Sequence, residues 1–335
     1  MDCCTFANLM KGKIFQFVKT WILPISIAVG VLGYLIYVHI PELNFTHHAV
    51  NCFVNIANPF LLFCMLLLSF CKIDFREIRP RPWMIYLLLV QIVGCTVFTI
   101  PLFLFPDSAY RILLEGGMLM FVCPTACAAV VVSYKLGGKM ENVIAYTIVS
   151  NIAAAILFPL IIALLSTTSG HIADVTFFST FLKILCHVFP ILILPMFVAE
   201  FLRHFMPRVH TYLAANTEAA FYIWALTLVF CMGISTKVLL ESNIQPSMLL
   251  FLALTILVCF DLQFRLGHKI GLRHSDRVAG GQTLGQKNTS FAIWLAYSFM
   301  TPVTALASGI YILYQNCFNS WQIYRKDNRK PYNRK

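Results

Sequence analysis

Long apolar runs separated by short charged connectors form the dominant pattern along the chain. Each run is long enough to cross the hydrocarbon core of a bilayer as a helix, which takes about 20 residues. The runs predict an all-α membrane protein with ten transmembrane helices. The ten predicted spans are Thr20–Pro41, Phe45–Cys71, Trp83–Phe105, Ala109–Gly137, Asn142–Leu165, Val175–Phe201, Ala215–Val238, Ser247–Gly267, Arg277–Met300 and Pro302–Trp321.

Basic residues alternate between the connectors and so indicate an orientation. Most of the Lys and Arg residues lie before the first span, in the second, fourth, sixth and eighth connectors, and after the last span. Lys237 and Arg111 are exceptions near the other connectors. Because cytoplasmic loops carry the excess of Lys and Arg, both termini are expected in the cytoplasm, which requires an even number of spans. We expect a multi-pass protein of the cell membrane, taken as a bacterial inner membrane.

Composition supports this assignment and removes other classes. The 335 residues are 59% hydrophobic and 12% charged, whereas a soluble domain has roughly 45–50% apolar and about 25% charged residues. The net charge of +11 lies in connectors rather than on a soluble face, so no nucleic-acid partner is expected. We expect residues 1–335 to form a single transmembrane transporter domain in the lipid bilayer, with a basic cytoplasmic tail at 322–335. The oligomeric state is left open.

A few ionisable residues fall inside the predicted spans, where such groups are functional candidates. Lys287 lies well inside the ninth span and is the strongest of these candidates. The others can lie near an interface or pair internally, and Glu115 and Asp261 are possible partners for Lys287. The candidates considered are Glu115, Lys183, Glu218, Asp261 and Lys287.

Two predicted spans have the composition of interrupted helices. Pro124 lies in the middle of the fourth span, where proline removes a backbone donor. Residues 280–288 of the ninth span read GGQTLGQKN, and irregular backbone at membrane depth is tolerated only inside protein or beside a cavity. These spans are the fourth of each set of five, so the sets would be inverted repeats with a binding site near the midplane. Half-helix N-termini there would favour an anion.

At these two segments the chain resembles the bile acid:sodium symporter family. The resemblance rests on residues 123–134, CPTACAAVVVSY, and residues 285–288, GQKN. It implies a panel of spans 1, 2, 6 and 7, a core of spans 3–5 and 8–10, and helices 4 and 9 that are broken and cross. It also implies that Gln91 helps to coordinate a cation and that Asn288 contacts the substrate, while Cys127 matches a family threonine close to it. With Gln286 and Thr125, these are the expected substrate contacts.

The departures from the family pattern concern the cation site. Ala129 and Val130 stand where the family has a Ser-Asn pair, and Thr283 stands where a glutamate is common. Lys287 replaces the family glutamine, and its ammonium would repel a nearby sodium ion. We therefore predict no conventional sodium site, with Lys287 supplying the missing charge. Because burial favours the neutral amine of a lysine, Lys287 could couple transport to protons or act as a fixed counter-charge.

A secondary transporter of a small organic anion, bile-acid-like or another organic acid, is the leading function. One alternative is a non-coupled channel-like or sensory protein of the same fold. Another is an arsenite exporter, since thiols suit that ligand and Cys123 and Cys127 flank Thr125. The His-Glu-x-x-His signature of a metalloprotease does not occur in the sequence, and we expect no enzymatic activity, resident metal or cofactor.

Overall fold

The computed structural model describes residues 22, 24–73, 79–168 and 177–328. Every regular element in these ranges is helical, apart from one isolated β-bridge. The first described helix runs over Pro24–His39, and the start of the first predicted span lies outside the described residues. The elements that follow are η1 (Pro41–Thr46), α2 (His47–Cys71), α3 (Met84–Leu104), α4 (Arg111–Val122), α5 (Ala128–Leu136), α6 (Met140–Thr168), α7 (Phe177–Leu192), α8 (Leu194–Phe205), α9 (Pro207–Ala215), α10 (Thr217–Glu241), α11 (Pro246–Arg273), α12 (Arg277–Gly285), α13 (Thr289–Phe299), η2 (Pro302–Thr304) and α14 (Ala305–Asp327).

Several of these helices have the length and apolarity of membrane spans. Five described helices, α2, α3, α6, α10 and α11, meet both requirements, and α7 with α8 forms a sixth span bent by 43° if the two count as one. The protein is therefore an α-helical, multi-pass membrane protein. The count of ten spans stays a prediction, because the other described helices are shorter or less apolar.

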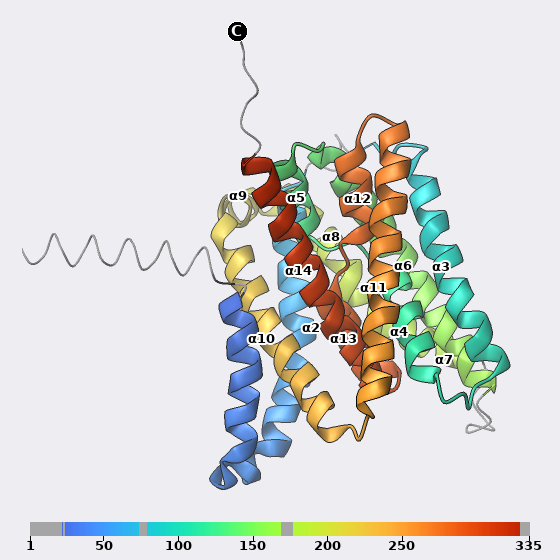
Figure 1. The fold of residues 1–335 in the computed structure, drawn as a ribbon. Coiled ribbons are helices and arrows are strands. Elements are labelled where there is room, and N and C mark those ends of the chain that lie inside the picture. The colour runs from blue at the N-terminus through green and yellow to red at the C-terminus, as the bar shows by residue number, and fades with distance from the viewer. Residues whose placement is uncertain (1–21, 23, 74–78, 169–176, 329–335) are drawn as a thin grey trace, which may run out of the picture.

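Two helices are interrupted at the places that the sequence predicts. α4 ends at Val122 and α5 begins at Ala128, while α12 ends at Gly285 and α13 begins at Thr289. Figure 1 shows α5 and α12 at one end of the bundle and α4 and α13 toward the other. The chain therefore passes through the two interruptions in opposite directions.

Close backbone contact between α11 and α12 positions the second interruption. Gly267 and Gly271 of α11 face Gly280 of α12. A Cβ added to Gly280 would lie 2.3 Å from the Gly267 carbonyl oxygen and 2.7 Å from the Gly271 Cα. Since backbone atoms cannot move aside as a flexible side chain can, only glycine allows this approach.

We expect Gly280→Val to destabilise the protein strongly, because the new side chain would force α12 away from α11. Overpacking of a well-packed interior costs typically about 1–3 kcal/mol, occasionally more, and contact with backbone leaves little room to relax. Thermal unfolding of the purified protein in detergent measures the effect. Gly33→Val is the matched control, since a Cβ at Gly33 meets nothing within 4 Å. Similar melting temperatures for the two variants would contradict this account of the packing.

The last helix extends into the range predicted as a tail. α14 continues to Asp327, so residues 322–327 are helical. The Lys326 ammonium donates a hydrogen bond to the Lys135 carbonyl at 2.6 Å, near the end of α5, which Gly137 terminates with φ of 84°. A cation at a helix C-terminus is favourable, so this basic residue joins α14 to α5.

Candidate functional site

The two interruptions pair with each other as short extended segments. Thr125 and Lys287 form an isolated antiparallel bridge. On either side of it, the Ala126 N–H donates to the Gln286 carbonyl at 3.0 Å and the Asn288 N–H donates to the Pro124 carbonyl at 2.9 Å. Backbone groups freed by an interrupted helix need partners at membrane depth. Each interruption therefore supplies one of the hydrogen bonds that the other has lost.

Side chains of α14 satisfy further backbone groups of the second interruption. The Tyr311 hydroxyl donates to the Gly285 carbonyl at 2.6 Å. Four residues later, the Gln315 side-chain oxygen accepts the Lys287 backbone N–H at 3.2 Å. Residues four apart lie on one face of a helix, so α14 holds both sides of this interruption with a single face.

α6 contacts the first interruption in a similar way. The Ser150 hydroxyl oxygen accepts the Thr125 N–H at 3.1 Å. Four residues earlier, the Tyr146 hydroxyl donates at 2.5 Å to the side-chain oxygen of Gln91 on α3. Gln91 in turn donates from Nε2 to the Phe121 carbonyl at 3.1 Å. The last carbonyls of α4 are thereby held by a side chain that α6 orients.

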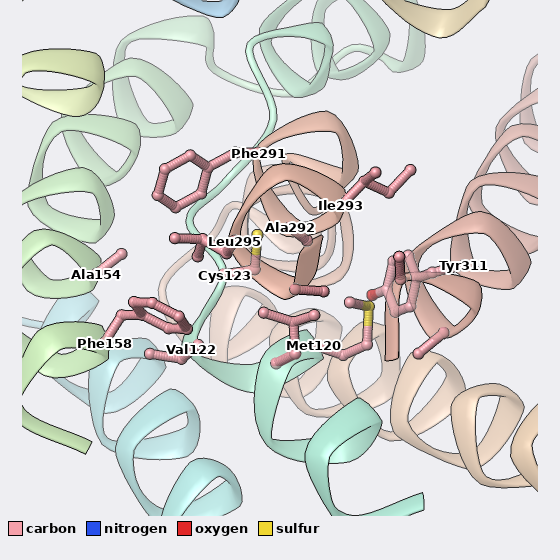
Figure 2. Close-up of a cluster of buried hydrophobic side chains, with 14 of the residues drawn as sticks. Met120, Val122, Cys123, Ala154, Phe158, Phe291, Ala292, Ile293, Leu295 and Tyr311 are labelled. Carbon is pink, nitrogen blue, oxygen red and sulfur yellow. The ribbon is translucent and has the colours of Figure 1, made fainter. Parts of the chain in front are cut away.

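Lys287 lies at the centre of this arrangement. Its side chain is 0% exposed, and its Nζ donates to the Cys123 carbonyl at 3.1 Å. The same carbonyl accepts a hydrogen bond from Gln91 Nε2 at 3.2 Å. Figure 2 shows Cys123 at the interruption, beside Ala292 and Leu295 of α13. The ammonium therefore lies just past the last residue of α4, at the negative end of its helix dipole.

The residues predicted to form the cation site have the following positions. Gln91 directs its amide nitrogen toward the interruption and its oxygen toward Tyr146. Ala129 is buried in the first turn of α5 and Val130 follows it. The Thr283 hydroxyl donates to the Ala279 carbonyl of its own helix at 2.8 Å. In the described hydrogen bonds, no side-chain oxygen of these residues contacts the Lys287 ammonium.

Among the predicted substrate contacts, most side-chain polar atoms already have hydrogen-bond partners, and one does not. The Thr125 hydroxyl donates to the Thr283 carbonyl at 2.6 Å, and Gln286 Nε2 donates to Asn319 at 3.1 Å and to Gln282. Asn288 Oδ1 accepts the Phe291 N–H at 3.3 Å, which caps α13. Its Nδ2 is buried without a partner among the described residues, so this donor is available to a ligand.

The two cysteines around Thr125 have different surroundings. The Cys123 thiol is fully buried and donates to the Asn288 carbonyl at 3.1 Å. Cys127 precedes α5 and is only half-buried. Cys123 therefore serves the pairing of the interruptions.

The two carboxylates suggested as partners of Lys287 have other partners. Glu115 is buried and accepts from Arg111 at 2.7 Å and from the Thr304 hydroxyl at 2.5 Å. Asp261 is largely exposed and pairs with Arg265 at 2.6 Å. Within the described part of the chain, neither carboxylate pairs with Lys287.

The remaining ionisable candidates of the spans are Lys183 and Glu218. Lys183 is exposed on α7. The side chain of Glu218 lies outside the described residues. Of these five ionisable candidates, Lys287 is therefore the one that the described contacts place at the interruptions.

Sequence reasoning did not select Tyr146, Ser150, Tyr311 or Gln315, although all four contact the interruptions or Gln91. The sequence did contain a signal for them. Tyr146 and Ser150 lie four positions apart in one apolar helix, and Tyr311 and Gln315 have the same spacing in another. Polar residues at membrane depth need partners, and the interruptions are the places with unpaired backbone groups. Matching these two facts would have found the four residues.

Comparison with protein families assigns the chain. The model of the sodium bile acid symporter family matches residues 59–264, which is more than half of the chain. The matched range contains Gln91 and the first interruption and ends before Lys287. None of the curated proteins compared with the chain matches it. The chain belongs to the sodium bile acid symporter family and is a membrane transporter of that kind.

Proposed function

We propose that the protein is a secondary transporter of a small organic anion, and that Lys287 replaces the sodium ion usual in its family. The single observation that carries this proposal is the hydrogen bond from the buried Lys287 ammonium to the Cys123 carbonyl. A helix C-terminus at membrane depth attracts a cation, and here the chain supplies a covalently attached one.

The oxygen atoms near the interruption do not fit a sodium ion. Hard cations such as sodium prefer oxygen ligands, but Ala129 and Val130 have no side-chain oxygen. Gln91 presents its nitrogen, and the Cys123 carbonyl already accepts two hydrogen bonds. An ammonium next to sodium would also be repelled strongly in a medium of low dielectric constant. We infer that sodium does not bind at this position.

Ten spans in two inverted sets agree with the arrangement of helices around the interruptions. α11, α12 and α14 each begin about 165 residues after α3, α4 and α6, as two repeats would require. The antiparallel bridge lies between the two sets, and the Tyr146–Ser150 pair of α6 corresponds to the Tyr311–Gln315 pair of α14. We propose one transporter domain, with a core of these helices, a panel of the rest, and both termini in the cytoplasm of a cell membrane.

The interruptions also suit a negatively charged substrate. α5 and α13 both begin there, and the N-terminal ends of helices favour anions. The free Nδ2 of Asn288 is a hydrogen-bond donor beside the start of α13. We propose that Asn288 and the ammonium of Lys287 together select an anion, with Cys127, Thr125 and Gln286 close to its path.

Uptake by proteoliposomes tests this function. Taurocholate, oestrone sulfate and pyruvate are suitable labelled probes, offered under an imposed sodium gradient, an imposed pH gradient, or neither. We expect saturable uptake of an anion that a sodium gradient does not increase. Stimulation by a pH gradient would indicate proton coupling, and its absence a fixed counter-charge. Uptake driven by sodium alone would contradict the proposal.

A channel-like function is the second candidate, because the residues that would bind a coupling ion are changed. Counterflow separates the two functions. Unlabelled substrate inside the vesicles accelerates the uptake of labelled substrate by a carrier, whereas a channel shows no such acceleration. We expect acceleration.

A further inference from the structure

Lys237 joins three helices at the end of the bundle predicted to face outward. It lies one turn before the end of α10, and its Nζ donates to Asn51 Oδ1 of α2 at 2.8 Å and to the Tyr297 hydroxyl of α13 at 3.4 Å. The ammonium also lies 5.9 Å from the centre of the Tyr297 ring. The side chain is half-buried. It can therefore be reached from water while it holds α2 and α10 against α13.

The charge of Lys237 is uncompensated within the described residues. Both of its hydrogen-bond acceptors are neutral. Glu241, on the next turn of α10, accepts instead from the Tyr34 hydroxyl at 3.4 Å. Arg111, the other cation near the predicted outer connectors, is paired with Glu115. Lys237 is therefore a positive charge without an acidic partner, among the described residues, that an arriving anion would meet at this end.

Two buried hydroxyls without partners among the described residues lie close to Lys237 in the sequence and in the seam between α10 and α14. Ser235 precedes Lys237 by two residues, and its hydroxyl is buried without a partner. A Cβ added to Gly309 of α14 would lie 2.9 Å from that hydroxyl. The neighbouring Ser308 hydroxyl is also buried and unpartnered. Buried hydroxyls without partners are uncommon, and two on facing helices indicate a place where a ligand or water binds.

We propose that Lys237, with Asn51 and Tyr297, forms an outer anion-binding site, and that Ser235 and Ser308 are the next contacts along the substrate's path. The inference rests on the proposed function, because it assigns the site to the same organic anion. A carboxylate or sulfonate makes stronger hydrogen bonds to an ammonium than neutral oxygen atoms do. The anion would therefore displace Asn51 or Tyr297 and loosen the contact between α10 and α13 as it binds.

Kinetics in right-side-out vesicles test the site, with the probe that the wild-type protein takes up best among taurocholate, oestrone sulfate and pyruvate. We expect Lys237→Gln to raise the KM at least tenfold with a smaller change in the maximal rate, and Lys237→Arg to restore most of the affinity. Raising the salt concentration screens exposed charges, so it should raise the KM of the wild type more than that of Lys237→Gln. Lys269→Gln is the matched control. It removes an exposed lysine near the C-terminal end of α11, which is predicted to face the cytoplasm, and should leave the KM unchanged.

Each outcome has a distinct meaning. An unchanged KM in Lys237→Gln would overturn the site, and a lower melting temperature with that unchanged KM would show that Lys237 only ties the helices together. A raised KM that Lys237→Arg does not restore would also overturn it, because the argument rests on positive charge. Wild-type protein that takes up none of the three probes would contradict the proposed function, and the site would fall with it.

Discussion

Replacing Lys287 with glutamine is expected to lower the rate of anion uptake roughly tenfold to a hundredfold. The change removes a charged hydrogen bond to the Cys123 carbonyl, and bonds of this kind contribute about 1.5–3 kcal/mol. Rates fall about tenfold for each 1.4 kcal/mol lost in the limiting step. Initial rates in proteoliposomes measure the effect, with size-exclusion profiles in detergent to confirm that the variant is folded.

Lys183→Gln makes the same chemical change at an exposed lysine of α7 and should leave uptake unchanged. A folded Lys287→Gln protein that transports at the full rate would contradict the role of the ammonium. Equal losses in both variants would point to a general effect of removing charge from the membrane region.

Arg111→Ala is expected to destabilise the protein by about 1–3 kcal/mol, the usual effect of leaving a buried polar group without its partner; Arg111 itself is 43% exposed. Glu115 is 3% exposed, so the change would leave a buried carboxylate supported mainly by the Thr304 and Thr301 hydroxyls. Adding Glu115→Gln should recover much of the stability, because a neutral amide needs no counter-charge. Thermal unfolding of both variants measures the cycle.

Arg265→Ala is the control, because Arg265 and Asp261 have the same four-residue spacing but are both exposed. Exposed pairs contribute about 0–1 kcal/mol. A loss of stability for Arg265→Ala as large as that for Arg111→Ala would refute the idea that burial makes the Glu115 pair important. Failure of Glu115→Gln to recover any stability would do the same.

The helical interruptions could be predicted because their causes are local. Pro124 lacks a backbone N–H, and the GGQTLGQKN segment combines flexible and polar residues where a lipid-facing helix requires apolar ones. The presence of a buried lysine in the second interruption followed from the same reading. These features depend on a few neighbouring residues, so one sequence is enough to find them.

The partners of the site residues could not be predicted because they come from distant parts of the chain. Tyr311 and Gln315 meet the second interruption only after α14 has packed against it. The orientation of the Gln91 amide depends on Tyr146, which lies on another helix. By contrast, Arg111 and Arg265 lie four residues from Glu115 and Asp261 on the same helices, a spacing that predicts these pairs directly.

Family membership and the site residues answer different questions. The family match identifies the protein as a transporter, but a fold or family does not fix what one site binds. The proposed loss of sodium coupling rests on Lys287, Ala129 and Val130, whose chemistry differs from that of a cation site. These residues make the coupling ion the feature in which this protein is proposed to depart from its family.

Binding of radioactive sodium to the purified protein tests the central claim most directly. Wild-type protein in detergent is incubated with ²²Na⁺ over a range of concentrations, with Lys287→Gln measured in parallel. Replacement of sodium by the Lys287 ammonium predicts no saturable binding to the wild type. Saturable binding of sodium to the wild-type protein, displaced by unlabelled sodium and lost on unfolding, would contradict the account.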